Sequence, residues 1–297
     1  MRKSALSLFF FTMVISVTAP VLDYAVDGPF SGSYSGWNRR TNQCDVSTSM
    51  NVYLPQASGS FPVFLYTVGT GALVSSAEGE LAAREMAKRG FVAAVLQYDS
   101  GAGFSCLSMQ RKAECTYSQN ASASAPALLC GLAQADCSKG IVVGGLSQGA
   151  NMAILAANYD SRVRAAWLMG FGGGASGNSY TECFIDSKTA LPSDRLRVVN
   201  GREGQGQPIA NLNNSTGTFC WPSRQSCFRA NGSGWYLVDN GQVEDGHADH
   251  CYFAGPASDG SEIGCSRNVV RGDVGWVPPA TAPWSLNAGL NWLASFR

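Results

Sequence analysis

The chain has 297 residues, and its 21 basic residues (Lys and Arg) balance its 21 acidic residues (Asp and Glu), so the formal net charge is zero. This balance excludes a surface that attracts nucleic acid or an anionic membrane through net charge. Hydrophobic residues make up 45% of the chain, enough for a globular core, and α/β domains of this length occur as single units.

The start of the chain has the pattern of a signal peptide. Basic residues begin it, an apolar run follows over 6–17, and small residues at 17–19 suit cleavage, although Pro20 disfavours a cut directly before it. We therefore expect a signal peptide over 1–19 and a single domain over 20–297, secreted from the cell or exported to a periplasm. A signal anchor is the alternative, but the apolar run is short for stable membrane insertion.

Strands and helices are predicted to alternate along most of the chain, which is typical of βαβ units and a mostly parallel sheet. Residues 20–48 are weakly patterned, and the cysteine-bearing segments 100–120 and 204–230 are expected to be loop insertions. In chain order, the expected strands lie at 50–54, 61–68, 91–98, 140–144, 163–169, 196–199 and 234–239, and the expected helices at 77–88, 121–135, 150–159 and 283–296.

Ten cysteines agree with export, because an even count in an exported chain indicates disulfides. Pairing of neighbours closes short loops and therefore favours four disulfides. They are Cys106 with Cys115, Cys130 with Cys137, Cys220 with Cys227, and Cys251 with Cys265. Glycosylation sequons begin at Asn120, Asn213, Asn214 and Asn231, and they matter if the source organism uses them.

The most informative motif is Gly145-Leu146-Ser147-Gln148-Gly149, which stands between an apolar β-branched strand and a helix-forming segment. A sharp strand-to-helix turn crowds the backbone, so residues without a Cβ are needed on both sides of its central residue. This G-x-S-x-G pattern predicts that the Ser147 hydroxyl is exposed above the sheet as a candidate nucleophile.

A serine nucleophile needs a base, and the chain contains only two histidines, His247 and His250. We favour His250, because the aromatic residues after it can pack the loop and a disulfide at Cys251 would hold the ring still. His247, which follows a glycine, is the alternative base. The side chains of His247, His250 and Cys251 would also suit zinc. Oxidation of Cys251 in a disulfide-rich chain argues against a metal there.

The carboxylate that orients the base should follow a strand that lies between Ser147 and the histidines in the sequence. Glu203 meets this condition, because it comes just after the strand expected at 196–199. Asp194 precedes that strand and so lies at its wrong end. Asp186 and Asp239 are weaker candidates.

An oxyanion formed during acyl transfer needs two backbone N–H donors. The residue after the nucleophile, Gln148, should supply one of them. Thr70 should supply the other, because Gly69 and Gly71 let the loop after the 61–68 strand approach a substrate closely.

Over residues 49–297, these features resemble the α/β-hydrolase superfamily in strand order and in the chain order serine, acid, histidine. The segment Gly-Leu-Ser-Gln-Gly-Ala at 145–150 is similar to the corresponding turn of cutinases, and the placement is similar to dienelactone hydrolases, chlorophyllases and polyester hydrolases. The resemblance implies an α/β fold in which helices flank a mostly parallel central sheet, with loop insertions pinned by disulfides.

We therefore expect a secreted serine hydrolase that cleaves carboxylic esters through an acyl-enzyme, without a metal or organic cofactor. Its substrate would be a small-molecule, lipid or polyester ester, and the protein would be a monomer. A peptidase or acyltransferase with the same triad is one alternative, and an inert binding protein of the same fold is another. The pocket walls are expected around Phe104, the segment 171–180 and Trp221.

Overall fold

The computed structural model describes residues 23–101, 105–172, 183–184, 188–203, 209–220, 225–244, 246–250 and 275–297. The expected signal peptide, the Cys251–Cys265 pair, Asp186, Phe104 and Trp221 lie outside the described residues.

The described chain is a mixed α/β fold built on a nine-stranded sheet in the order β1-β2-β4-β3-β5-β6-β7-β9-β8. The pairs from β4 across to β9 are parallel, and only β1, β2 and β8 join the sheet in antiparallel fashion. The mostly parallel sheet confirms this part of the prediction. The strands are β1 (Val26–Asn38), β2 (Gln43–Pro55), β3 (Val63–Thr67), β4 (Val92–Leu96), β5 (Ile141–Leu146), β6 (Val163–Met169), β7 (Leu196–Gly201), β8 (Ser226–Phe228) and β9 (Gly234–Val238).

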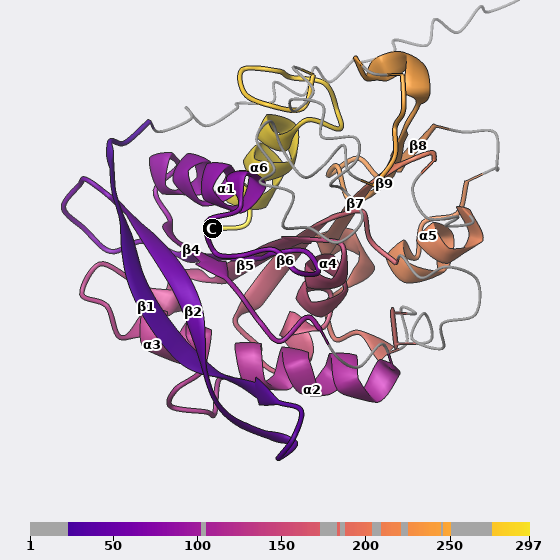
Figure 1. Ribbon diagram of the computed structural model, residues 1–297. Coiled ribbons are helices and arrows are strands. Elements are labelled where there is room, and N and C mark those ends of the chain that lie inside the picture. Colours follow the sequence, from indigo (N-terminus) through magenta and orange to yellow (C-terminus); the bar gives the residue numbers. More distant parts are fainter. Residues whose placement is uncertain are drawn as a thin grey trace, which may run out of the picture.

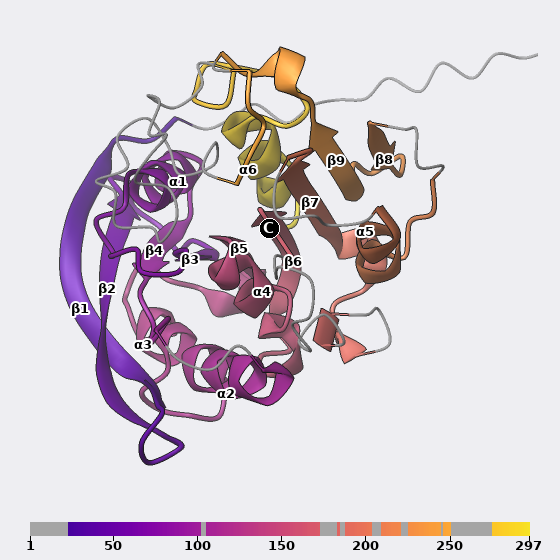
Figure 2. The same ribbon diagram turned by 45° about the vertical axis from the view of Figure 1, so that its right-hand side comes forward.

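Helices cover both faces of the sheet (Figures 1 and 2). Helices α1 and α6 pack on one face, and α2, α3 and α4 lie on the other. None of the helices in the described part of the chain is long and apolar enough to cross a membrane. The helices are α1 (Ala77–Lys88), α2 (Cys106–Tyr117), α3 (Ala125–Cys130), α4 (Gln148–Ala153), α5 (Ile209–Thr216) and α6 (Leu286–Ala294).

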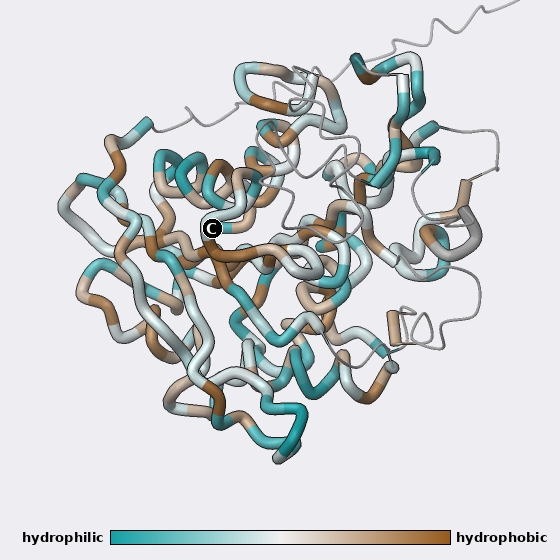
Figure 3. The backbone as a smooth tube through the Cα atoms, viewed as in Figure 1, coloured by the Kyte–Doolittle hydropathy of each residue, from teal (hydrophilic) through white to brown (hydrophobic). Residues whose placement is uncertain are grey.

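The hydrophobic core lies along the central strands. Strands β3, β4 and β5 are buried at every position, as expected for parallel strands covered on both faces. Hydrophobic segments accordingly run through the middle of the molecule, whereas the far turn of the β1–β2 hairpin is hydrophilic (Figure 3). The parallel strands are therefore held by packing on both faces. The loops that follow their carboxyl ends carry the candidate site.

One region without a predicted element has regular structure, and two expected loop insertions are wrong. Within this weakly patterned region, residues 26–48 form most of a long hairpin, because the Gly- and Ser-rich first strand is held by pairing with β2 rather than by alternating burial. The expected loop at 100–120 mostly forms helix α2, which begins with a capping box between Ser105 and Ser108. The segment 204–230 likewise includes α5 and β8.

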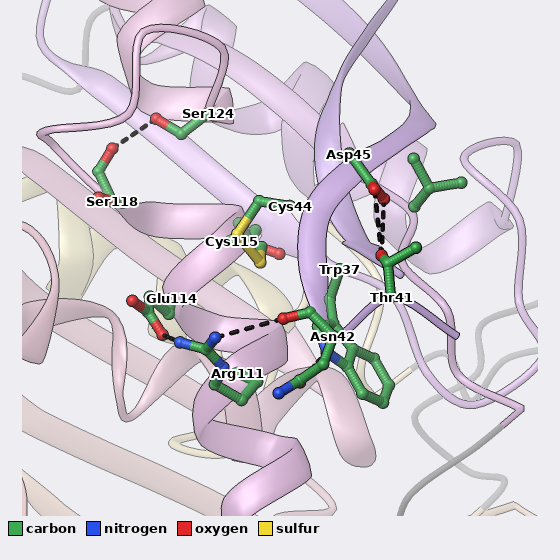
Figure 4. Close-up of a disulfide and its surroundings, with 12 residues drawn as sticks. Trp37, Thr41, Asn42, Cys44, Asp45, Arg111, Glu114, Cys115, Ser118 and Ser124 are labelled. Carbon is green, nitrogen blue, oxygen red and sulfur yellow. Dashed lines mark hydrogen bonds and ion pairs between the residues drawn. A yellow bond between two sulfur atoms is a disulfide. The ribbon is translucent and has the colours of Figure 1, made fainter. Parts of the chain in front are cut away.

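Four disulfides are present among the described residues. Cys130–Cys137 and Cys220–Cys227 confirm the expected pairs. The Cys106–Cys115 pair is wrong, because both residues lie on α2, where nine residues span about 13 Å, too far for one disulfide. Instead Cys106 pairs with Cys183, and Cys115 pairs with Cys44 at the end of the hairpin (Figure 4). Disulfides in this number are typical of an oxidising compartment.

In two of the four sequons, the asparagine side chain makes hydrogen bonds within the protein. Asn213 donates to the carbonyl of Cys220 and accepts a hydrogen bond from the Trp235 indole. The Asn231 amide donates to the carbonyl of Asp194. Asn120 and Asn214 are exposed, so they are the better acceptors for a glycan.

Candidate active site

Ser147 has an uncommon backbone conformation at the turn between β5 and α4. Its φ of 58° and ψ of −125° place a residue with a Cβ in a region that favours glycine. Such a conformation costs about 1–3 kcal/mol and persists only where its surroundings enforce it. The Ser147 amide donates to the carbonyl of Met169 on β6, and its carbonyl accepts from Asn151 on α4, so both neighbouring elements hold the turn.

The two glycines of the motif allow α4 to pack directly against the end of β3, as the sequence predicts. A Cβ on Gly149 would lie 2.2 Å from the carbonyl oxygen of Thr67 and 2.3 Å from that of Val68. A Cβ on Gly145 would lie 2.6 Å from the carbonyl carbon of Gly149. Because all of these neighbours are backbone atoms, they could not move aside for a side chain at either position.

The loop after β3 lies against this turn and carries Thr70. Gly71 has a φ of +82°, and its amide donates to the Ser100 hydroxyl at 2.9 Å. The amide of Ala72 donates to the carbonyl of Gly69. Within the described residues, the amides of Thr70 and Gln148 donate to no protein group. This is the state required of the two donors predicted from the sequence.

Glu203 follows β7 and is hydrogen-bonded to His247. The Nδ1 atom of His247 lies 3.1 Å from Oε2 of Glu203, and the amide of Asn240 donates to Oε1. These hydrogen bonds, from His247 first and then from Asn240, lower the pKa of Glu203. A backbone hydrogen bond also joins the loop of Glu203 to the loop of His247, because the Glu203 amide donates to the carbonyl of Ala248 at 3.0 Å.

His250 lies against the end of β6. A Cβ on Gly170 would lie 2.6 Å from Cε1 of His250, so the imidazole packs directly on the backbone after β6. Gly170 follows Met169, whose carbonyl accepts the amide proton of Ser147. Strand β6 stands between β5, which leads to Ser147, and β7, which leads to Glu203. His250 therefore lies at the end of β6, the strand between the two that lead to Ser147 and Glu203.

The predicted site residues therefore lie at one edge of the sheet, but they are not all joined. The Ser147 hydroxyl makes no hydrogen bond with either histidine among the described residues, and the carboxylate of Glu203 contacts His247 rather than His250. A hydroxyl–imidazole contact often tightens only when substrate binds.

The other carboxylates considered from the sequence fit the site less well. Asp239 forms an ion pair with Arg202. It directly follows β9, which lies farther than β7 from the strand that leads to Ser147. Asp194 is exposed at the amino end of β7, the wrong end for the site. Among the described residues, no group of three His, Cys, Asp or Glu side chains could hold a metal.

Three buried polar residues of the site were missed from the sequence. Asn151 on α4 and Asn200 on β7 accept the amide protons of Gly172 and Phe171, each at 2.8 Å, and so hold the loop after β6. Asn200 also donates back to the carbonyl of Phe171. Asn200 could have been found from the sequence, because it is a polar residue at the end of an apolar strand. The third residue, Lys112 on α2, stands among other polar helix residues and gave no such signal.

No protein-family model matches this chain, and no curated protein matches it. Its function must therefore be inferred from the site itself.

Proposed function

We propose that this protein is a secreted serine hydrolase of carboxylic esters with an α/β-hydrolase fold. The observation that carries the proposal is the conformation of Ser147, a non-glycine residue held at positive φ between a buried strand and a helix. Strain of this kind is concentrated at functional sites, and here it is maintained by two glycines that tolerate no side chain.

In the proposed reaction, the Ser147 hydroxyl attacks the ester carbonyl while the base takes its proton. The amides of Thr70 and Gln148 donate to the oxygen of the tetrahedral intermediate, where negative charge develops. The base then protonates the leaving alcohol, and an acyl-enzyme remains. Water, activated by the same base, releases the acid and restores the serine.

We assign the base to His250, because its ring lies over the end of β6, between the strands that lead to Ser147 and Glu203. Glu203 is the proposed acid, and its contacts with His247 and Ala248 fix the loop that carries His250. His247 is the alternative base, favoured by its hydrogen bond from Nδ1 to a carboxylate, which is the arrangement of a triad.

The strand order supports the α/β-hydrolase assignment. The nucleophile follows the central strand β5, the acid follows β7, and the histidines follow β9, all at the same edge of the sheet. The four disulfides and the amino-terminal sequence pattern support secretion. The substrate class that fits this chemistry is a carboxylic ester of a small molecule, a lipid or a polyester, hydrolysed by a monomer.

The test is to treat the oxidised, full-length mature protein with a fluorophosphonate and locate the adduct by peptide mass spectrometry. We expect the adduct on Ser147, hydrolysis of p-nitrophenyl butyrate but not of peptide p-nitroanilides, and a loss of at least about 10³-fold in kcat for Ser147→Ala. Faster turnover of the anilides would make the protein a peptidase. A folded protein with no adduct and no turnover would make it a binding protein.

A further inference from the structure

Lys112 is a buried cation beside the residue that follows the nucleophile. Lys112 is only 1% exposed, and its Nζ donates to the Oε1 atom of Gln148 at 3.2 Å. Gln148 is itself 4% exposed, and among the described residues its Nε2 atom has no hydrogen-bond partner. The contact with Lys112 is therefore what fixes the orientation of the Gln148 amide group in the described part of the chain.

Aromatic rings from two other elements surround the ammonium. Its Nζ lies 5.6 Å from the centre of the Trp37 ring at the end of β1 and 5.7 Å from the centre of the Tyr98 ring after β4. The Trp37 indole donates to the Asn42 side chain, and Cys44–Cys115 ties this end of the hairpin to α2 (Figure 4). The position of Lys112 is thus held by a disulfide, a hairpin and a cation–π arrangement.

A lysine is a costly choice for this position. Burial of an ammonium group disfavours its charged form, and an apolar side chain of similar volume would fill the same space without that cost. Packing alone therefore does not explain the residue. Among the described residues, the ammonium donates to Gln148, whose backbone amide is one of the two donors in the proposed site.

We propose that Lys112 is a positioning residue for the oxyanion hole, which holds the Gln148 side chain and thereby the direction of the Gln148 backbone N–H. This inference rests on the proposed ester hydrolase function. Because the contact acts on the tetrahedral intermediate through Gln148, its loss should lower kcat and leave KM nearly unchanged.

The ammonium also makes the contact dependent on pH. Burial lowers the pKa of Lys112 to about 8, although Asp99 acts in the opposite direction. The titratable groups that face Lys112 among the described residues are Tyr98 and Asp99, and Asp99 is also 3.8 Å from Arg39. From the other elements, β1 contributes Trp37 and α4 contributes Gln148, neither of which titrates. Above pH 8 the amine loses its charge, so kcat should fall there.

The decisive experiment measures kcat and KM for p-nitrophenyl butyrate in Lys112→Met and Lys112→Arg from about pH 7 to about pH 10. We expect Lys112→Met to lose about 10-fold to 10²-fold in kcat at pH 7 with KM within about twofold, and to lack the alkaline fall of the wild type. Lys112→Arg should keep part of kcat and remain flat above pH 8, because arginine stays charged. The matched control is Lys139→Met, the same change at an exposed lysine before β5.

Thermal unfolding separates positioning from a structural role. Lys112→Met should unfold at the wild-type temperature or above it, because it removes a buried charge. A kcat within twofold of the wild type would overturn the inference and leave the proposed function intact. If Lys112→Met does not fold, an alkaline fall in Lys112→Arg equal to that of the wild type would overturn it instead. Absence of turnover that depends on Ser147 would overturn both proposals.

Discussion

The two halves of the candidate site are built in different ways. Around Ser147, glycine backbones, the end of β3 and helix α4 are in direct contact, and nearly every neighbouring residue is buried. Around Glu203 and the histidines, loops meet through a few hydrogen bonds, and the side chains of His247 and Glu203 are 65% and 41% exposed. Ser147 is therefore held by backbone sterics, whereas Glu203 and His247 are held by side-chain contacts that solvent screens.

This difference shows where rigidity is needed for the proposed reaction. The nucleophile and the oxyanion donors must be aligned to a fraction of an ångström, because a misplacement of 1 Å can cost about 10²-fold in rate. The base has to move between the serine and the leaving group, and a loop held by hydrogen bonds allows that. The predictions below test whether the two halves differ in this way.

The largest effect is expected from the base. His250→Ala should lower kcat for p-nitrophenyl butyrate by at least about 10³-fold, because the Ser147 hydroxyl then has no proton acceptor. His247→Ala should lower it by less than about 10-fold, because it removes only a contact that holds the loop. Steady-state kinetics of the two variants, with thermal unfolding as the control for folding, decide the assignment. The opposite ranking would make His247 the base.

The next effect is on the serine half. Gly149→Ala should lower the free energy of unfolding by about 3 kcal/mol, because the new methyl group would meet two backbone oxygens closer than 2.5 Å. Gly241→Ala is the matched control, since a Cβ there has nothing within 4 Å, and it should change stability by less than about 0.5 kcal/mol. Urea unfolding of the two variants measures the difference. Equal stabilities would show that the turn is not enforced by close packing.

The same difference explains which parts could be predicted from the sequence. The strand–turn–helix at Ser147 is local, so the motif and its flanking residues were sufficient to place it. The strands β3, β4, β5, β6, β7 and β9 and the helix α1 were found because each has a clear apolar pattern or cap. The position of Glu203 at the end of β7 followed from chain order, since this residue comes just after a buried strand.

What could not be predicted depends on contacts between distant segments. The first strand has no useful alternation of buried residues, so its pairing with β2 was missed. The pairs Cys44–Cys115 and Cys106–Cys183 join residues 71 and 77 positions apart, and spacing along the chain could not indicate them. The burial of Lys112 could not be predicted for the same reason. It arises only because α2 packs against the hairpin and α4.

The smallest effect, and the one that bears most directly on the exposed half, concerns Glu203. In the folded protein, hydrogen bonds from His247 and Asn240 lower the pKa of this carboxyl below its value in the unfolded chain. The unfolded chain then binds more protons between the two pKa values, so stability rises with pH there. The contribution of Glu203 is fully present above the unfolded pKa of about 4.3 and is lost as pH falls through the folded pKa.

Glu203→Gln removes this titration and keeps the size of the side chain. We expect the variant to be less stable than the wild type at pH 7, and the difference in unfolding temperature to shrink as pH is lowered from about 5 to about 3. It should also lower kcat by about 10-fold to 10²-fold, less than the loss of the base, since Glu203 acts by orienting the histidine loop. A difference in unfolding temperature that does not change with pH would show that the carboxylate holds no charge-dependent contact, and the acid of the site would then have to be another residue.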